Sequence, residues 1–339
     1  MLSPNTVTRA RLSRRSMMCV GGSVMAAIAA NPGQAQPDSP VGPPPHAKGP
    51  LVFLDYDQVE LDAAYDQSVY APNMRQVVKR WASNSELTRA RLGVPRRFAY
   101  GPADIEALDV FPTKRPNAPI FIFIHGGAWR ALKAADVAFP AELFVNAGAH
   151  YVVPNFDWVQ NAGGSLMPIA DQVRRAIAWV HANAARFGGD PAGIYVGGQS
   201  SGGHLAGVAL TTDWQKDFGL PPDLIKGGVC VSGMYDLAPV RLSKRSAYIK
   251  FDDAMVQALS SQRHIDNLRV PLIVAYGTEE SPEFQRQSRD FAAAVKAAGK
   301  AVEPIAAENY NHFELLETLA SPYGILGNAA LRMMKLGSV

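Results

Sequence analysis

The sequence of 339 residues contains only two cysteines, Cys19 and Cys230, and no group of cysteines and histidines has the spacing of metal ligands. It also lacks the glycine-rich patterns that bind dinucleotides and nucleoside triphosphates. Cys19 lies in a segment that we expect to be removed, so the mature chain keeps one thiol and cannot form an internal disulfide. Cys230 lies in the apolar run "GGVCVSG", where a small buried side chain is the expected role.

A strong excess of charge is also missing. The formal net charge of +3 includes Arg9, Arg11, Arg14 and Arg15, which lie in the first 35 residues where there is no acidic residue. Subtracting these four charges leaves about −1 for the rest of the chain, so nothing attracts it to nucleic acid or to anionic lipid. An apolar fraction of 47% is typical of a globular protein and excludes disorder along most of the chain.

The first 35 residues have the pattern of a twin-arginine export signal. Arg14 and Arg15 precede the apolar run 17–30, and small residues at 33–35 offer a cleavage site. The apolar run has 14 residues and is shorter than the ~20 that a spanning helix needs, although an anchor or an unstructured terminus remains an alternative. We therefore expect an exported, periplasmic protein without stable membrane insertion after processing.

The remaining chain predicts one α/β domain over 51–339, preceded by a linker at 36–50 that is rich in proline and glycine. Short runs that are apolar on both faces alternate with helical stretches, which indicates a mostly parallel sheet covered by helices. A helical segment before the first of these runs is expected to cap the core. The predicted strands are 118–124, 150–156, 193–198, 227–233, 271–277 and a final one in "AVEPIA".

The stretch "YVGGQSSGGHLAG" at 195–207 contains two adjacent serines, of which only Ser200 fits the pattern G-x-S-x-G, between Gly198 and Gly202. Ser201 would need a glycine where Gln199 stands. The motif follows a predicted strand and precedes a helix, which is the context of a nucleophile elbow. Such a tight turn leaves no room for side chains two residues on either side of the serine.

A second glycine-rich loop, "HGGAW" at 125–129, follows the predicted strand 118–124. Backbone N–H groups of Gly126 and Gly127 could pair with the N–H of Ser201 to stabilise an oxyanion. Two loops of this type, in this order, favour acyl-transfer chemistry over a plain packing role.

A serine nucleophile needs a base and an acid, which in this fold follow it along the chain. His312 in "ENYNHFELLE" is the predicted base, since it follows the last predicted strand. Glu280 is the predicted acid because it lies three residues after Gly277 at the end of a strand; Glu279 and Asp236 remain alternatives.

In these motifs, the sequence resembles the α/β-hydrolase superfamily, and within it the kynurenine-formamidase-like and hormone-sensitive-lipase-like esterases. The matching segments are "HGGAW", "GQSSGGHLA", "SGMYDL", "GTEESPEFQRQS" and "NHF". The resemblance implies an eight-stranded, mostly parallel sheet, no cofactor, no metal and an acyl-serine intermediate. The family usually has an aspartate in the loop that holds Glu279 and Glu280.

The resemblance allows three functions. Cleavage of small carboxylic esters ranks first and hydrolysis of an N-formyl aromatic amine such as N-formylkynurenine second, because the latter is a cytoplasmic reaction and this chain has an export signal. A non-catalytic binding protein of the same fold ranks third. Trp129, Trp158, Tyr70 and Trp81 are candidate walls of the substrate pocket, with ordinary core packing as the alternative. The expected partner is a small molecule.

Overall fold

The computed structural model describes residues 42–337; the predicted signal at 1–35 and the beginning of the predicted linker lie outside that range. One sheet contains eight strands, which in chain order are β3 (Arg96–Ala99), β4 (Ala107–Phe111), β5 (Ala118–Ile124), β6 (His150–Pro154), β7 (Gly189–Gln199), β8 (Ile225–Val231), β9 (Leu272–Gly277) and β10 (Val302–Ala307).

The strands lie side by side in the order β10-β9-β8-β7-β5-β6-β4-β3. Neighbouring strands are parallel from β10 to β6, whereas β4 is antiparallel to β6 and β3 is antiparallel to β4. This arrangement confirms the expected mostly parallel, eight-stranded sheet, and the carboxyl ends of its parallel strands meet at one edge, where ligands bind in such folds.

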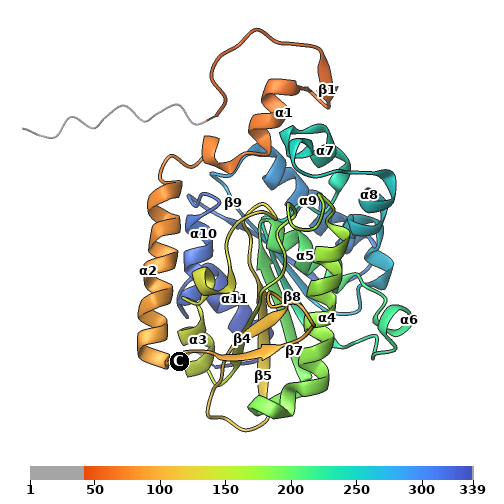
Figure 1. The fold of residues 1–339 in the computed structure, drawn as a ribbon. Coiled ribbons are helices and arrows are strands. Elements are labelled where there is room, and N and C mark those ends of the chain that lie inside the picture. The colour runs from red at the N-terminus through yellow and green to blue at the C-terminus, as the bar shows by residue number, and fades with distance from the viewer. Residues whose placement is uncertain (1–41, 338–339) are drawn as a thin grey trace, which may run out of the picture. The chain divides into compact units, whose positions relative to one another are not determined.

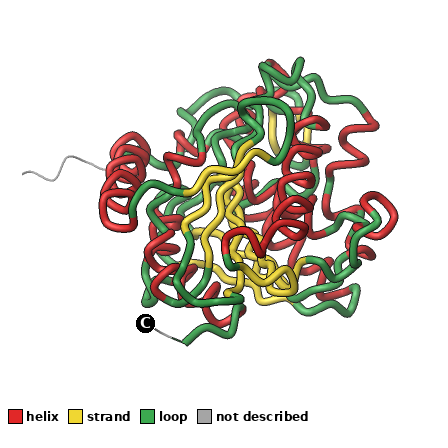
Figure 2. Tube along the Cα trace, turned by 60° about the horizontal axis from the view of Figure 1, so that its bottom comes forward, coloured by secondary structure: helices red, strands yellow, loops and turns green. Residues whose placement is uncertain are grey.

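Helices cover both faces of the sheet (Figures 1 and 2). Alternate side chains of β5 lie on opposite faces of the sheet and belong to two different cores. Ile120 and Ile122 belong to one apolar cluster, and Phe121 and Phe123 belong to the other. The α-helices of the first face are α4 (Met167–Asn183), α5 (Ser201–Leu210), α7 (Leu237–Leu242), α8 (Asp253–Leu259) and α9 (Pro282–Ala297), and those of the second are α2 (Met74–Leu92), α3 (Ala141–Asn146), α10 (Glu314–Glu317) and α11 (Ile325–Met333).

The shorter elements include α6 (Trp214–Phe218) and single 3-10 turns. Those turns are η1 (Gln67–Val69), η2 (Ala134–Val137), η3 (Ala184–Phe187), η4 (Lys244–Ala247), η5 (Ser261–Arg263), η6 (Ile265–Asn267) and η7 (Thr318–Ala320). Over residues 42–337, no helix is both long enough and apolar enough to cross a membrane.

The segment before the main sheet forms a small hairpin of β1 (Leu51–Phe53) and β2 (Tyr56–Asp57), followed by α1 (Gln58–Ala64). The end of the predicted linker is bound to this unit, because Gly49 donates its backbone N–H to Asp57. Within 42–50, therefore, the last residues of the predicted linker are attached to the folded domain rather than forming a free tether.

The sequence patterns located the central strands but not all their ends. Strand β7 begins at Gly189, four residues before the predicted start, and neither β3 nor β4 was predicted. Strand β3 has the sequence "RRFA" at the sheet edge, where most of its side chains are exposed and no apolar run is needed.

Candidate active site

Ser200 occupies the sharp turn between β7 and α5. Its backbone has φ 61° and ψ −126°, a conformation that non-glycine residues rarely adopt and that costs on the order of 1–3 kcal/mol. The N–H of Ser200 donates to the carbonyl of Val231 at 2.9 Å, which fixes the turn to the end of β8. The surrounding structure thus holds one serine in a strained conformation at the carboxyl edge of the sheet.

The glycines around Ser200 are required by close backbone contacts. A Cβ atom added at Gly198 would lie 2.2 Å from the carbonyl oxygen of Gly202, and one added at Gly202 would lie 2.0 Å from that of Ile124. Both distances are far below van der Waals contact with rigid backbone atoms. The G-x-S-x-G spacing therefore has the steric origin that the sequence predicted.

The glycine-rich loop after β5 lies against this turn. A Cβ atom added at Gly126 would lie 3.2 Å from the Cβ of Ser200. Gly127, Ala128 and Trp129 all have positive φ, so the loop is sharply bent, and the N–H of Trp129 donates to the Ser201 hydroxyl at 3.1 Å. The two predicted loops therefore lie together in the structure and are joined by a hydrogen bond.

His312 and Glu280 form a buried pair, each 3% exposed. Nδ1 of His312 lies 3.0 Å from Oε2 of Glu280, so Nδ1–H donates to the carboxylate and Nε2 is left free to accept a proton. The rings of Phe284 and Phe313 contact the imidazole edge to face, both with centroids 5.1 Å away. The imidazole is thereby held in one orientation.

A side chain that the sequence analysis did not single out links this pair to the serine turn. Gln199, directly before Ser200, donates from Nε2 to the backbone carbonyl of His312 at 3.0 Å and is 2% exposed. Within 42–337, no hydrogen bond joins Ser200 to His312. Hydrogen bonds of this kind are often long before substrate binds. The only sequence signal for this role was the position of Gln199 inside the motif.

The competing acids lie elsewhere. Glu279 is exposed, although it adjoins Glu280 in the chain. Asp236 caps α7 by accepting from the N–H of Ala238, and it also lies 3.6 Å from Arg263. The structure therefore pairs Glu280, and neither alternative, with His312.

The helical segment before the sheet supports the loop that carries Glu280. The hydroxyl of Ser281 donates to the carbonyl of Ala64 at 2.6 Å, and the side chain of Gln67 both donates to and accepts from Ser281. Nearby, Tyr65 donates its hydroxyl to the fully buried Glu283 at 2.8 Å. The predicted cap thus positions the acid loop from the outside.

Two further histidines are buried beside the loops, and burial lowers the pKa of His125 and of His204 to about 4. Nδ1 of His204 accepts from Nε1 of Trp129 at 3.2 Å, so its Nε2–H donates to the carbonyl of Leu259 at 2.9 Å. His125 stacks on Phe156 with centroids 4.3 Å apart. These rings are neutral supports of the glycine-rich loops.

The low pKa of His204 predicts a loss of stability in acid. Because its folded-state value of about 4 lies below the unfolded value of about 6.5, the unfolded chain binds the proton first as pH falls through that window. Between pH 7 and pH 5, this histidine should cost about 2 kcal/mol of unfolding free energy. Chemical denaturation should show a smaller acid loss for His204→Gln than for the unaltered protein.

The matched control is His181→Gln, at a partly exposed histidine on α4. This change should leave the difference in unfolding free energy between pH 7 and pH 5 as it is in the unaltered protein. If the His204→Gln variant lost as much unfolding free energy between pH 7 and pH 5 as the unaltered protein, His204 would not be the cause of the loss.

The four candidate pocket residues have different environments. Trp158 lines a cavity of about 200 Å³ beside the glycine-rich loop, together with His125, Phe156, Asp157 and Lys133. Trp129 and Trp81 are 1% and 2% exposed and belong to the two apolar cores, while Tyr70 is partly exposed. Trp158 is therefore the candidate that lines a cavity, although neither Ser200 nor His312 lines the same cavity. Core packing describes Trp129 and Trp81.

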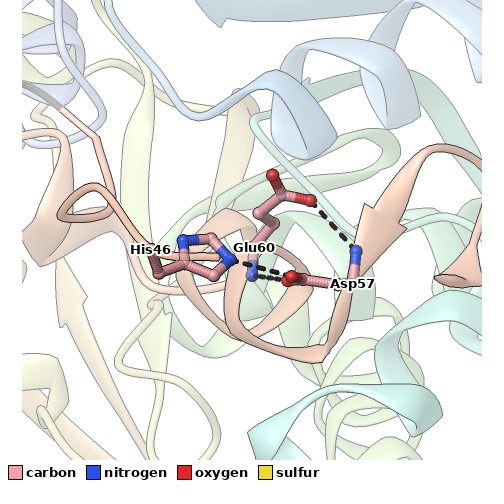
Figure 3. Close-up of side chains that lie close together, drawn as sticks. All are labelled: His46, Asp57 and Glu60. Atoms are coloured by element: carbon pink, nitrogen blue, oxygen red, sulfur yellow. Dashed lines mark hydrogen bonds and ion pairs between the residues drawn. The ribbon is translucent and has the colours of Figure 1, made fainter. Parts of the chain in front are cut away.

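One group of side chains away from this site has the composition of a metal centre. His46, Asp57 and Glu60 place one possible ligand atom each within 4.8 Å of the others (Figure 3). Asp57 and Glu60, however, form a capping box at the start of α1, and Glu60 also binds Lys48. These oxygens already accept hydrogen bonds, and backbone N–H groups hold the pKa of Asp57 well below its usual range. The group acts as a helix cap.

Comparisons with known proteins agree with the fold. The BD-FAE family model matches residues 108–225. The kynurenine formamidase of Danio rerio is 30% identical, and the match covers 81% of this chain and 96% of that protein. Esterase LipC of Mycobacterium tuberculosis is 32% identical over 68% of this chain and 59% of its own length.

Solved structures share the fold at lower identity. Esterase B from Lactobacillus rhamnosis is 16% identical with a TM-score of 0.62, covering 80% of this chain and 95% of its own. The Pyrobaculum calidifontis esterase is 18% identical with a TM-score of 0.59, covering 80% and 97%. With the serine turn, the glycine-rich loop and the relatives in agreement, the chain belongs to the α/β-hydrolase superfamily, in the group of kynurenine formamidases and hormone-sensitive-lipase-like esterases, and is a hydrolase.

Proposed function

We propose that the protein is a serine hydrolase that cleaves small carboxylic esters, with Ser200, His312 and Glu280 as its catalytic triad. The observation that carries the proposal is the buried hydrogen bond from His312 to Glu280, which is tied through Gln199 to the strained serine turn. A base oriented by an acid next to a constrained serine is the arrangement that activates a hydroxyl.

In the proposed reaction, Nε2 of His312 takes the hydroxyl proton of Ser200 as its oxygen attacks the ester carbonyl. The tetrahedral intermediate collapses, His312 gives the proton to the departing alkoxide, and the acyl group stays on Ser200. Water then attacks the acyl-serine with the same proton transfers, which releases the acid and restores the serine. The carboxylate of Glu280 orients the imidazole and stabilises the imidazolium.

Backbone N–H groups of Gly127 and Ser201, assisted by Gly126, are the proposed donors to the oxyanion. Support comes from the contact of Gly126 with Ser200 and from the hydrogen bond between Trp129 and the Ser201 hydroxyl, which hold both loops in place. Fixed donors need no reorganisation as charge develops, and each is worth about 3–4 kcal/mol of barrier in acyl-transfer enzymes.

A second candidate function is hydrolysis of an N-formyl aromatic amine, which uses the same triad. The observation in its favour is the match to a kynurenine formamidase over 96% of that protein. Ester cleavage ranks first because hydrolysis of N-formylkynurenine is a cytoplasmic reaction. We also propose that the segment 1–35 is a twin-arginine signal, which would export the protein to the periplasm. A non-catalytic role ranks last, since Ser200, His312 and Glu280 are all retained.

Steady-state hydrolysis of p-nitrophenyl acetate, longer p-nitrophenyl esters and N-formylkynurenine tests the proposal, with Ser200→Ala as the blank. We expect kcat/KM for the acetate to exceed that for the formamide by at least tenfold. A formamide rate that exceeds all ester rates would reverse the ranking.

A further inference from the structure

The Glu280 carboxylate has two oxygens, and only Oε2 contacts His312. The other oxygen, Oε1, accepts two hydrogen bonds, one from the Ser232 hydroxyl at 2.5 Å and one from the backbone N–H of Gly277 at 2.8 Å. Hydrogen bonds from hydroxyl groups to carboxylates are short and strong when the acceptor is ionised. Each oxygen of this buried group therefore has its own partners.

Ser232 is placed for this contact by the end of β8. Its N–H donates to the carbonyl of Ala275 on β9 at 2.8 Å, its φ is +49°, and its side chain is fully buried. A serine in this left-handed conformation is strained, and its hydroxyl reaches the carboxylate on the neighbouring loop. The backbone of Ser232 is thus fixed on both β8 and β9 before the side chain contacts Glu280.

Gly277 provides the second anchor because its loop lies against the loop of His312. A Cβ atom added at Gly277 would lie 2.1 Å from the carbonyl oxygen of Tyr310, two residues before the histidine. The acid loop and the histidine loop are therefore in direct backbone contact. A carboxylate held to Gly277 and Ser232 is held at a fixed place relative to His312.

Glutamate needs such support, because its carboxylate sits on three side-chain torsions and loses rotamer freedom when it is fixed. We propose that Ser232 is a positioning residue, whose hydroxyl fixes the Glu280 carboxylate so that Oε2 orients the imidazole of His312. This inference rests on the proposed function. It assigns to Ser232 an effect on the rate of acylation and none on substrate binding.

A double-mutant cycle on the full chain tests the inference, using Ser232→Ala, Glu280→Ala and the double variant with p-nitrophenyl acetate. Ser232→Ala should lower kcat by about 10- to 100-fold and change KM by less than threefold. In the Glu280→Ala background the same change should cost less than threefold, because the group through which Ser232 acts is gone. Ser232→Gly should behave like Ser232→Ala, since glycine tolerates φ +49° and keeps the turn folded.

Ser85→Ala is the matched control for the loss of a buried hydroxyl. Ser85 on α2 is also fully buried and makes two hydrogen bonds, to the carbonyl of Asp136 and from the N–H of Phe139, both at 3.0 Å. Its replacement should lower thermal stability while changing kcat by the same small factor with or without Glu280. Equal losses from Ser232→Ala in both backgrounds, a loss confined to KM, or full activity of Ser232→Gly would overturn the inference.

The outcomes also separate this inference from the proposed function. An inactive Ser200→Ala variant with fully active Ser232→Ala and Ser232→Gly variants would leave the hydrolase proposal standing and remove Ser232 from it. Full activity of Ser200→Ala would remove the proposed triad, because Ser200 would not be the nucleophile.

Discussion

Replacing Ser200 with alanine is expected to lower kcat for p-nitrophenyl acetate by roughly 10⁵–10⁶-fold, because no other group can carry the acyl intermediate. The fold should survive, since the backbone N–H of Ser200 still donates to Val231 and the glycines around the turn are unchanged. Rates should be measured with purified protein against the uncatalysed reaction, with circular dichroism as the check on folding.

Ser201→Ala is the control for this experiment. Ser201 keeps its backbone N–H as alanine, so the proposed oxyanion donor remains, although the N–H of Trp129 loses its acceptor. We expect kcat within about tenfold of the unaltered protein and a stability loss of about 1–3 kcal/mol. Should Ser200→Ala keep full activity while Ser201→Ala does not, the nucleophile would have to be reassigned.

The reason that Ser200 could be selected from the sequence is steric. The motif needs a glycine two residues before and two residues after the serine, because backbone segments approach closely at both positions. The structure has these close approaches at Gly198 and Gly202. The alternation of apolar runs located the central strands for a similar reason, since buried parallel strands must be apolar on both faces. The sequence alone therefore predicts a feature when the physical constraint behind it involves residues that are close together in the chain.

The supports of the site could not be predicted, because they join residues that are distant in the chain. Gln199 contacts a carbonyl 113 residues later, and Ser232 contacts a carboxylate 48 residues later. No local pattern indicates which buried polar side chain meets which partner. The same limit applies to Trp129 and Trp81, because a large aromatic residue has the same sequence signal in a core as in a pocket wall.

Glu280→Gln is expected to lower kcat by roughly 10³–10⁴-fold with little change in KM. A glutamine amide in place of Oε2 would present a donor to Nδ1 of His312 and favour the wrong tautomer, and the imidazolium would lose its counter-charge. The amide can keep its carbonyl oxygen toward Ser232 and Gly277, so the loop should remain folded. The measurement is kcat and KM for p-nitrophenyl acetate from pH 6 to pH 9.

Glu279→Gln is the matched control, because it makes the same chemical change one residue earlier. The Glu279 side chain is exposed, and its backbone N–H, which donates to Tyr310, is retained in the variant. We expect kcat within about twofold of the unaltered protein, so the two neighbouring variants should differ by at least 10²-fold. The reverse ranking would mean that the loop rearranges when substrate binds and that the exposed glutamate replaces the buried one beside His312.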